Sequence, residues 1–230
     1  MSLAVREGER PHFRTKAELV YEELREALVT GRLTPGERID QDALARDYGV
    51  SNMPIRQALV RLESQRLVES RPHHGVLVAS MSAADMEEIY AMRSVLEQLV
   101  AERAAQRITE STLDALEALL VLQESAVAAG DFGRYVQLDR RFHRDLYASS
   151  DMRRCCDTIE FLRDASDRYV HAYAEHRGKS NTSVEEHRRI IAAARAGEAT
   201  VLGELCREHV IGASALLLHV INANGDAPVG

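Results

Sequence analysis

Apolar residues in the first third of the chain recur at helical spacing in three stretches. Thr15 can cap a helix over residues 16–30, and a second helix ends at Gly49, which tolerates the left-handed backbone of a helix terminus. A third helix begins at Ser51, whose side chain is expected to accept a backbone N–H at the helix start, and runs to about residue 66. We expect the first helix to bury a stripe formed by Leu19, Val20, Leu24, Ala27 and Leu28.

Two short runs with β-type composition follow the third helix. Residues 67–70 and 75–79 are rich in Val and Leu and flank a four-residue tip, Arg71-Pro72-His73-His74. Residues 31–39 are interpreted as a turn. Three helices followed by a β-ribbon predict a winged helix-turn-helix, which delivers one helix to the major groove of DNA.

The third helix carries polar residues opposite its apolar face. Side chains near the N-terminus of a recognition helix reach base edges, and cationic tips of a ribbon suit phosphates or the minor groove. A simpler alternative is an amphipathic helical hairpin with no role in nucleic-acid binding. On the outward face lie Asn52, Met53, Arg56, Gln57, Val60 and Arg61.

Charge divides the chain into two parts. Residues 1–80 hold 12 Lys and Arg against 12 Asp and Glu, whereas residues 81–230 hold 17 against 24 and carry the whole net charge of −7. DNA attraction must therefore come from local clustering of arginines and wing histidines. We expect a tail over 1–14, a DNA-binding domain over 15–80, a different, acidic domain over 81–222, and a tail over 223–230.

The second part is predicted to be helical throughout. Caps and breaks delimit six helices that are joined by short connections, which favours one antiparallel bundle. The fold class is therefore mainly α, a winged helix-turn-helix plus a six-helix bundle. The expected helices cover residues 82–107, 109–129, 131–149, 152 to about His176, 183–196, and 198 to about 222.

Four potential metal ligands fall in this bundle. Asp139 and His143 are four residues apart on one helix, so both leave the same face. His187 lies ten residues before Gly197 and His209 twelve after it, so a hairpin that turns there brings them to similar heights. Three imidazoles and one carboxylate suit a divalent Zn, Ni, Mn or Fe ion with positions open for exchangeable ligands.

The first part contains a Leu33-Thr34-Pro35-Gly36 turn, a Gly-Val-Ser turn and the string Pro-Ile-Arg-Gln-Ala-Leu. With these motifs it resembles the GntR family of bacterial transcription regulators. Asn52 stands where the family usually has Arg, which would shift the preferred base from guanine towards adenine. The resemblance implies DNA contacts by Ser51, Asn52, Met53, Arg56, His74 and Gly75, to which the helix pattern adds Arg61.

The second part has an Arg-x-x-Leu-Glu motif at Arg93, the Asp139-to-His143 spacing and two later histidines. With this pattern it resembles the FCD effector domain of the FadR branch, in its shorter, VanR-like, metal-binding form, which implies an effector-binding, metal-binding and dimerisation domain over residues 81–222. A metal with open positions and a nearby arginine suit a small organic acid as effector. The resemblance implies that Arg93 is this arginine, and Arg163 is a weaker candidate; the alternative for each is a surface or ion-pair arginine.

Together these features predict a homodimeric DNA-binding transcription regulator that binds an inverted-repeat operator and acts as a repressor relieved by its effector. Two alternatives use the same residues: a metal-dependent enzyme, which would need a general acid or base beside the metal, and a regulator whose metal is only structural.

Composition places the protein in the cytoplasm without a membrane partner. The sequence has no run of about 18 apolar residues, and Arg6, Glu7, Glu9 and Arg10 interrupt the start of the chain, where a signal peptide needs an apolar core. The cysteines are too few for a disulfide framework and are interpreted as reduced thiols, with redox sensing by the vicinal pair as the alternative. They are Cys155, Cys156 and Cys206.

Overall fold

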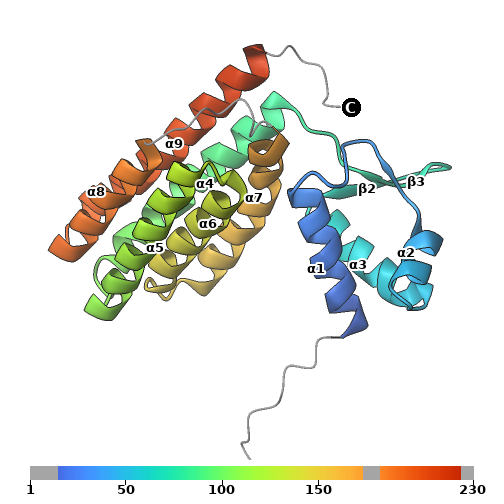
Figure 1. The fold of residues 1–230 in the computed structure, drawn as a ribbon, viewed down its shortest axis with the longest axis horizontal. Coiled ribbons are helices and arrows are strands. Elements are labelled where there is room, and N and C mark those ends of the chain that lie inside the picture. The colour runs from blue at the N-terminus through green and yellow to red at the C-terminus, as the bar shows by residue number, and fades with distance from the viewer. Residues whose placement is uncertain (1–14, 173–181, 224–230) are drawn as a thin grey trace, which may run out of the picture.

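The computed structural model describes residues 15–172 and 182–223, which form a small N-terminal part beside a helical bundle (Figure 1). The mainly α fold predicted from the sequence is confirmed. The expected tails lie outside the described residues, except that Ala223 ends the last helix. The expected end of the fourth bundle helix near His176 also lies outside them.

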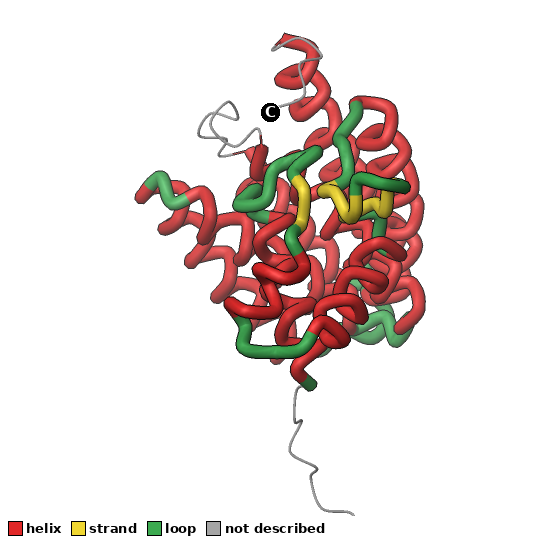
Figure 2. The backbone as a smooth tube through the Cα atoms, turned by 90° about the vertical axis from the view of Figure 1, so that its right-hand side faces the viewer, coloured by secondary structure: helices red, strands yellow, loops and turns green. Residues whose placement is uncertain are grey.

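The N-terminal part contains three helices and a small antiparallel sheet (Figure 2). The sheet order is β1-β3-β2, with Arg38 opposite Leu77 and Val68 opposite Val78. Strand β1 lies in the segment interpreted as a turn. It was not predicted because two residues are too few to show an alternating pattern. The elements are α1 (Lys16–Val29), β1 (Arg38–Ile39), α2 (Gln41–Asp47), α3 (Asn52–Ser64), β2 (Val68–Arg71) and β3 (Gly75–Val78).

Local signals explain most of these boundaries. Thr15 forms a capping box with Glu18, and Asp40 caps α2. Two expectations were wrong in detail. Ser51 occupies the N-cap position of α3 but its side chain makes no capping hydrogen bond. Leu19 is 48% exposed, because the buried face of α1 is centred between Val20 and Tyr21 and Leu19 points roughly 100° away from Val20.

The C-terminal part is an antiparallel bundle of six helices. Its largest apolar cluster draws on all six helices, including Ile159 of α7, while a second cluster around Tyr169 joins α7, the N-terminal part of α4 and α9. Gly130 ends α5 in the left-handed conformation. The helices are α4 (Ala83–Ala104), α5 (Glu110–Ala129), α6 (Phe132–Ala148), α7 (Arg153–Ala172), α8 (Thr182–Ala196) and α9 (Ala199–Ala223).

Helix α7 connects the two parts. Asp164 forms an ion pair with Arg25 of α1, and Arg168 donates a hydrogen bond to the backbone carbonyl of Ala79. The Tyr169 hydroxyl accepts a hydrogen bond from the backbone N–H of Ser82 at 3.1 Å. One helix therefore holds both the first helix and the segment that links the two parts.

Candidate metal centre and DNA-reading surface

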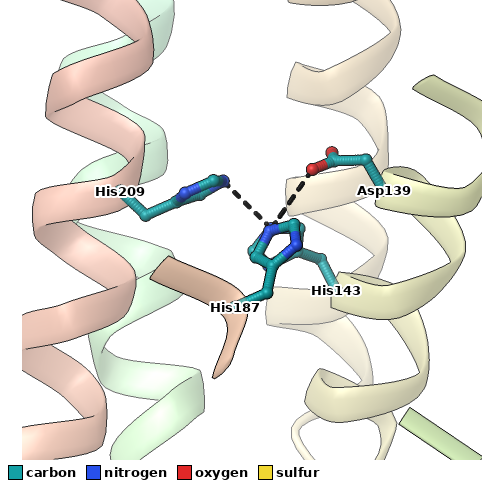
Figure 3. Close-up of side chains that lie close together, drawn as sticks. All are labelled: Asp139, His143, His187 and His209. Carbon is teal, nitrogen blue, oxygen red and sulfur yellow. Dashed lines mark hydrogen bonds and ion pairs between the residues drawn. The ribbon is translucent and has the colours of Figure 1, made fainter. Parts of the chain in front are cut away.

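Three helices of the bundle bring Asp139, His143, His187 and His209 together (Figure 3). Helix α6 supplies Asp139 and His143, α8 supplies His187, and α9 supplies His209. One potential ligand atom from each lies within 4.8 Å of all the others. The three histidines are buried, and the side chain of Asp139 is 21% exposed.

Each imidazole uses its Nδ1 for an outer hydrogen bond. The Tyr147 hydroxyl donates its only proton to Glu97 at 2.7 Å, so it must accept from His143 Nδ1 at 3.1 Å. His187 Nδ1 donates to Gln123 Oε1 at 2.8 Å. His209 Nδ1 donates to Glu186 at 2.7 Å. In neutral imidazoles with this proton on Nδ1, all three Nε2 atoms carry lone pairs.

These three lone pairs point at one another. His143 Nε2 lies 3.2 Å from both His187 Nε2 and His209 Nε2, and no proton is left to bridge either pair. The Asp139 Oδ1 atom lies 3.4 Å from His187 Nε2 and 3.8 Å from His143 Nε2. A tetrahedral ion with bonds of about 2.0–2.1 Å separates its ligand atoms by roughly 3.3–3.4 Å. The donor set therefore fits a divalent metal ion.

Electrostatics favour the protonation states that bind a metal. Burial lowers the pKa of His143 well below its ordinary value, and the neighbouring Arg163 lowers it further. Burial also lowers the pKa of His187, to about 3. Burial alone would raise the pKa of Asp139, but His187 and Arg163 outweigh it and the pKa is lowered. Neutral imidazoles and an ionised carboxylate are the forms that coordinate metals.

Two buried arginines lie beside this centre. Arg163 contacts Asp139 at 3.4 Å and Glu97 at 3.3 Å, and its Nε–H is buried with no hydrogen-bond partner in the described part of the chain. The Arg93 guanidinium instead donates hydrogen bonds to Glu97 at 2.8 Å and to Ser166 at 2.9 Å. The resemblance favoured Arg93, whereas the structure places Arg163 against Asp139, one of the four candidate metal ligands.

Sequence reasoning missed the outer partners of the histidines. Gln123, Tyr147 and Glu186 carry no signal in a single sequence, because their roles depend on which helices become neighbours. Glu186 is the neighbour of His187 in the sequence, yet its carboxylate accepts the Nδ1 proton of His209. Such partners fix the tautomer and the orientation of metal-binding imidazoles.

The exposed face of α3 forms a separate candidate surface. Ser51, Met53 and Arg56 are exposed there, and Met53 is 64% exposed. A large apolar side chain in this position is typical of a surface that becomes covered on binding. These residues lie at the N-terminal end of α3, as a recognition helix requires.

Two predicted contact residues on α3 have partners within the protein. Asn52 is half-buried and donates to Asp42 of α2 at 2.9 Å, which ties together the two helices of the turn. Arg61 places its guanidinium 3.6 Å from the centre of the Tyr21 ring on α1. Both therefore also hold the helices of this part in place.

The tip of the ribbon is exposed and geometrically constrained. His73 has φ +66° and Gly75 has φ +80°, so a substitution at Gly75 would strain the backbone. Arg38 of β1 was missed in the sequence, yet its side chain lies over Gly75, within 3.6 Å of where a Cβ atom would be. Arg38, His74 and Gly75 thus form one edge of the wing.

Comparison with known families matches both parts. The bacterial regulatory proteins of the gntR family match residues 16–78, and the FCD domain matches residues 88–212. The chain belongs to the GntR family of bacterial regulators. It is a DNA-binding transcriptional regulator with an FCD domain.

Individual relatives of this GntR regulator agree with that assignment. The chain is 34% identical to the HTH-type transcriptional regulator YdhC of Bacillus subtilis over 74% of its own length and 76% of the relative. It is 27% identical to the HTH-type transcriptional repressor RspR of Escherichia coli over 90% and 91%.

Among solved structures, E. coli McbR/YncC matches with a TM-score of 0.81 and 26% identity, covering 89% of this chain and 98% of that one. These relatives are regulators, which favours the regulatory interpretation of the bundle over the enzymatic one. Within the described residues, no helix has the length and apolar character needed to cross a bilayer.

Proposed function

We propose that this GntR regulator is a homodimeric repressor whose operator binding is controlled by a small organic acid at a divalent metal centre. The observation that carries the proposal is that the Nε2 atoms of three histidines and the carboxylate of Asp139 meet at one point. Without a cation, these electron-rich atoms would repel one another at 3.2 Å in a buried site. Asp139, His143, His187 and His209 would hold the ion, which is Zn, Ni, Mn or Fe by the chemistry of the donors.

A bound ion with open positions supplies a Lewis acid that can take the carboxylate or hydroxyl of a small acid. In this proposal Arg163 binds a second oxygen of that acid, which is supported by its buried and unpartnered Nε–H. Arg93, whose guanidinium is engaged by Glu97 and Ser166, supports Arg163 through the shared Glu97 carboxylate.

Control of DNA binding needs a physical connection between the two parts. Arg163 and Asp164 are neighbours on α7; the first contacts the metal ligand Asp139 and the second pairs with Arg25 of α1. A ligand that repositions Arg163 would therefore bias the contact between α7 and α1. Only a difference in affinity for the two arrangements can shift the equilibrium, so the acid must bind better when the protein is off its operator.

The DNA contacts are proposed for Ser51, Asn52, Met53, Arg56, Arg61, His74 and Gly75, with Arg38 added from the structure. The first test is a mobility-shift assay with DNA flanking the regulator's own gene. We expect binding by the native protein, about tenfold weaker binding by Arg56→Ala, and unchanged binding by Arg141→Ala, an exposed arginine of α6. No binding of the native protein at low salt would refute the operator at this location.

The metal centre is tested separately by elemental analysis of purified protein. His143→Ala and His209→Ala should each lose the bound metal, whereas His219→Ala, an exposed histidine on α9, should retain it. Equal metal content in all four proteins would remove the site. Small hydroxy acids and dicarboxylic acids that raise the thermal midpoint only of metal-loaded protein would support the effector role, and a metal that stabilises without any acid-dependent shift would favour a structural role.

A further inference from the structure

Helix α4 is apolar on a side that the bundle leaves uncovered. Its inner faces pack against α9, α7 and α6. On its outer face Met92 is 42% exposed, Val95 64% and Leu99 46%. These three residues are spaced three and four apart, so they form one continuous stripe. An exposed apolar stripe of this kind is typical of a surface that a partner covers.

Charged residues end this stripe with opposite signs. Glu88 lies one turn before Met92, and Arg103 lies one turn after Leu99, both exposed. The order Glu88, Met92, Val95, Leu99, Arg103 is symmetric about a point just after Val95. Residues 88 and 103 are equally distant from that point, and so are residues 92 and 99.

We propose that this stripe pairs with the same stripe of a second copy of the chain, with the two α4 helices crossing antiparallel about a two-fold axis near Val95. Met92 then meets Leu99 of the partner subunit, and Glu88 meets Arg103 of the partner subunit. Each contact occurs twice, as an isologous interface demands. The inference rests on the homodimer of the proposed function and names the surface that forms it.

Charge complementarity favours a second copy over an unrelated partner. A parallel arrangement of the same helices would bring Glu88 against Glu88 and Arg103 against Arg103, whereas the antiparallel one pairs opposite signs at both ends. The stripe is about 22 Å long from residue 88 to residue 103. A stable dimer buries about 800 Å² on each partner, so α4 forms the centre of the interface and the adjacent α9 must add to it.

The first test compares Val95→Glu with Val121→Glu in the full-length protein. Val121 is a matched control because it is 62% exposed on α5, away from the stripe. Sedimentation equilibrium should show a dimer for the native protein and for Val121→Glu, and at least a 100-fold weaker dimer for Val95→Glu. Circular dichroism should report the same helix content in all three.

The second test uses charge reversal. Glu88→Arg and Arg103→Glu should each weaken the dimer about tenfold, and the double variant should restore it, because the reversed pairs attract again. If the dimer of the double variant is weakened by the product of the two single reductions in affinity, the antiparallel register is refuted. If the native protein is a dimer and Val95→Glu does not weaken it, the α4 interface is refuted while the homodimer stands, and the stripe has another binding partner. A native monomer at all concentrations would refute the homodimer of the proposed function.

Discussion

Glu97 lies at the centre of the buried charges beside the metal ligands. It is fully buried and accepts hydrogen bonds from Arg93 at 2.8 Å, from the Tyr147 hydroxyl at 2.7 Å and from Arg163 at 3.3 Å. Glu97→Gln keeps the shape of the side chain but removes the negative charge. Two buried guanidinium groups then lose the carboxylate that they share, and we expect the folded protein to be destabilised.

The size of the effect follows from the pKa of this carboxyl. Burial alone would raise the pKa of Glu97, but Arg93 and Arg163 outweigh burial and hold it at about 2, against an ordinary value of 4.5. Each pKa unit is worth about 1.4 kcal/mol, so the ionised carboxylate contributes about 3 kcal/mol to the free energy of unfolding at pH 7. Such a loss is a large fraction of the usual stability of a domain.

The lowered pKa of Glu97 determines how its contribution to the free energy of unfolding changes with pH. The contribution is complete above the unfolded value of 4.5 and disappears as pH falls through the folded value of about 2. Urea unfolding of native protein and Glu97→Gln should therefore differ by about 3 kcal/mol at pH 7 and by about 2 kcal/mol near pH 3.5. Taking the difference cancels the titration of the histidines, which both proteins share.

Glu87→Gln is the matched control, because Glu87 is exposed on the same helix. It should change the free energy of unfolding by less than about 0.5 kcal/mol. If Glu97→Gln were as stable as this control at pH 7, the argument that Glu97 neutralises two buried arginines would be wrong.

Three further predictions test other parts of the molecule. Tyr147→Phe removes the acceptor of the His143 Nδ1 proton and should weaken metal binding 10- to 100-fold in a competition titration with a chelator, whereas Tyr48→Phe, at an exposed tyrosine just after α2, should not. Asp164→Asn should leave the affinity for the acid effector within about threefold but reduce its effect on operator binding at least fivefold, measured by fluorescence anisotropy; full retention of the effect would exclude this contact from the coupling. Arg38→Ala should weaken operator binding about tenfold and flatten its salt dependence while metal content stays constant; an unchanged salt slope would place Arg38 away from the phosphates.

Much of the fold could be predicted because its signals are local. Capping residues, glycine breaks and apolar spacing lie within a few positions of each other, so Thr15 and Gly49 mark helix ends in the sequence itself. Strand β1 was not predicted because two residues are too few to show an alternating pattern, and its pairing partner lies about 40 residues away. The exposure of Leu19 could not be foreseen because the neighbours of α1 decide which face is buried.

The candidate site divides in the same way. The spacing of Asp139 and His143 and the positions of His187 and His209 around Gly197 predict that four donors can meet, and the structure brings them together. The difference between Arg93 and Arg163 depends on how far α7 lies from α6, which no local pattern encodes. The outer partners Gln123 and Tyr147 depend on the same tertiary packing.

The hold of α7 on the linking segment limits how the regulator can move. Arg168 donates a hydrogen bond to the carbonyl of Ala79, and the Tyr169 hydroxyl accepts one from the N–H of Ser82, so the linking segment is fixed to α7 at two positions. We therefore expect that a rotation of α3 also moves the end of α7. In the proposed dimer, a change in the spacing of the two recognition helices would then require a rigid-body rotation of α7 within the bundle, and a variant that lacks both hydrogen bonds would let the two parts move independently.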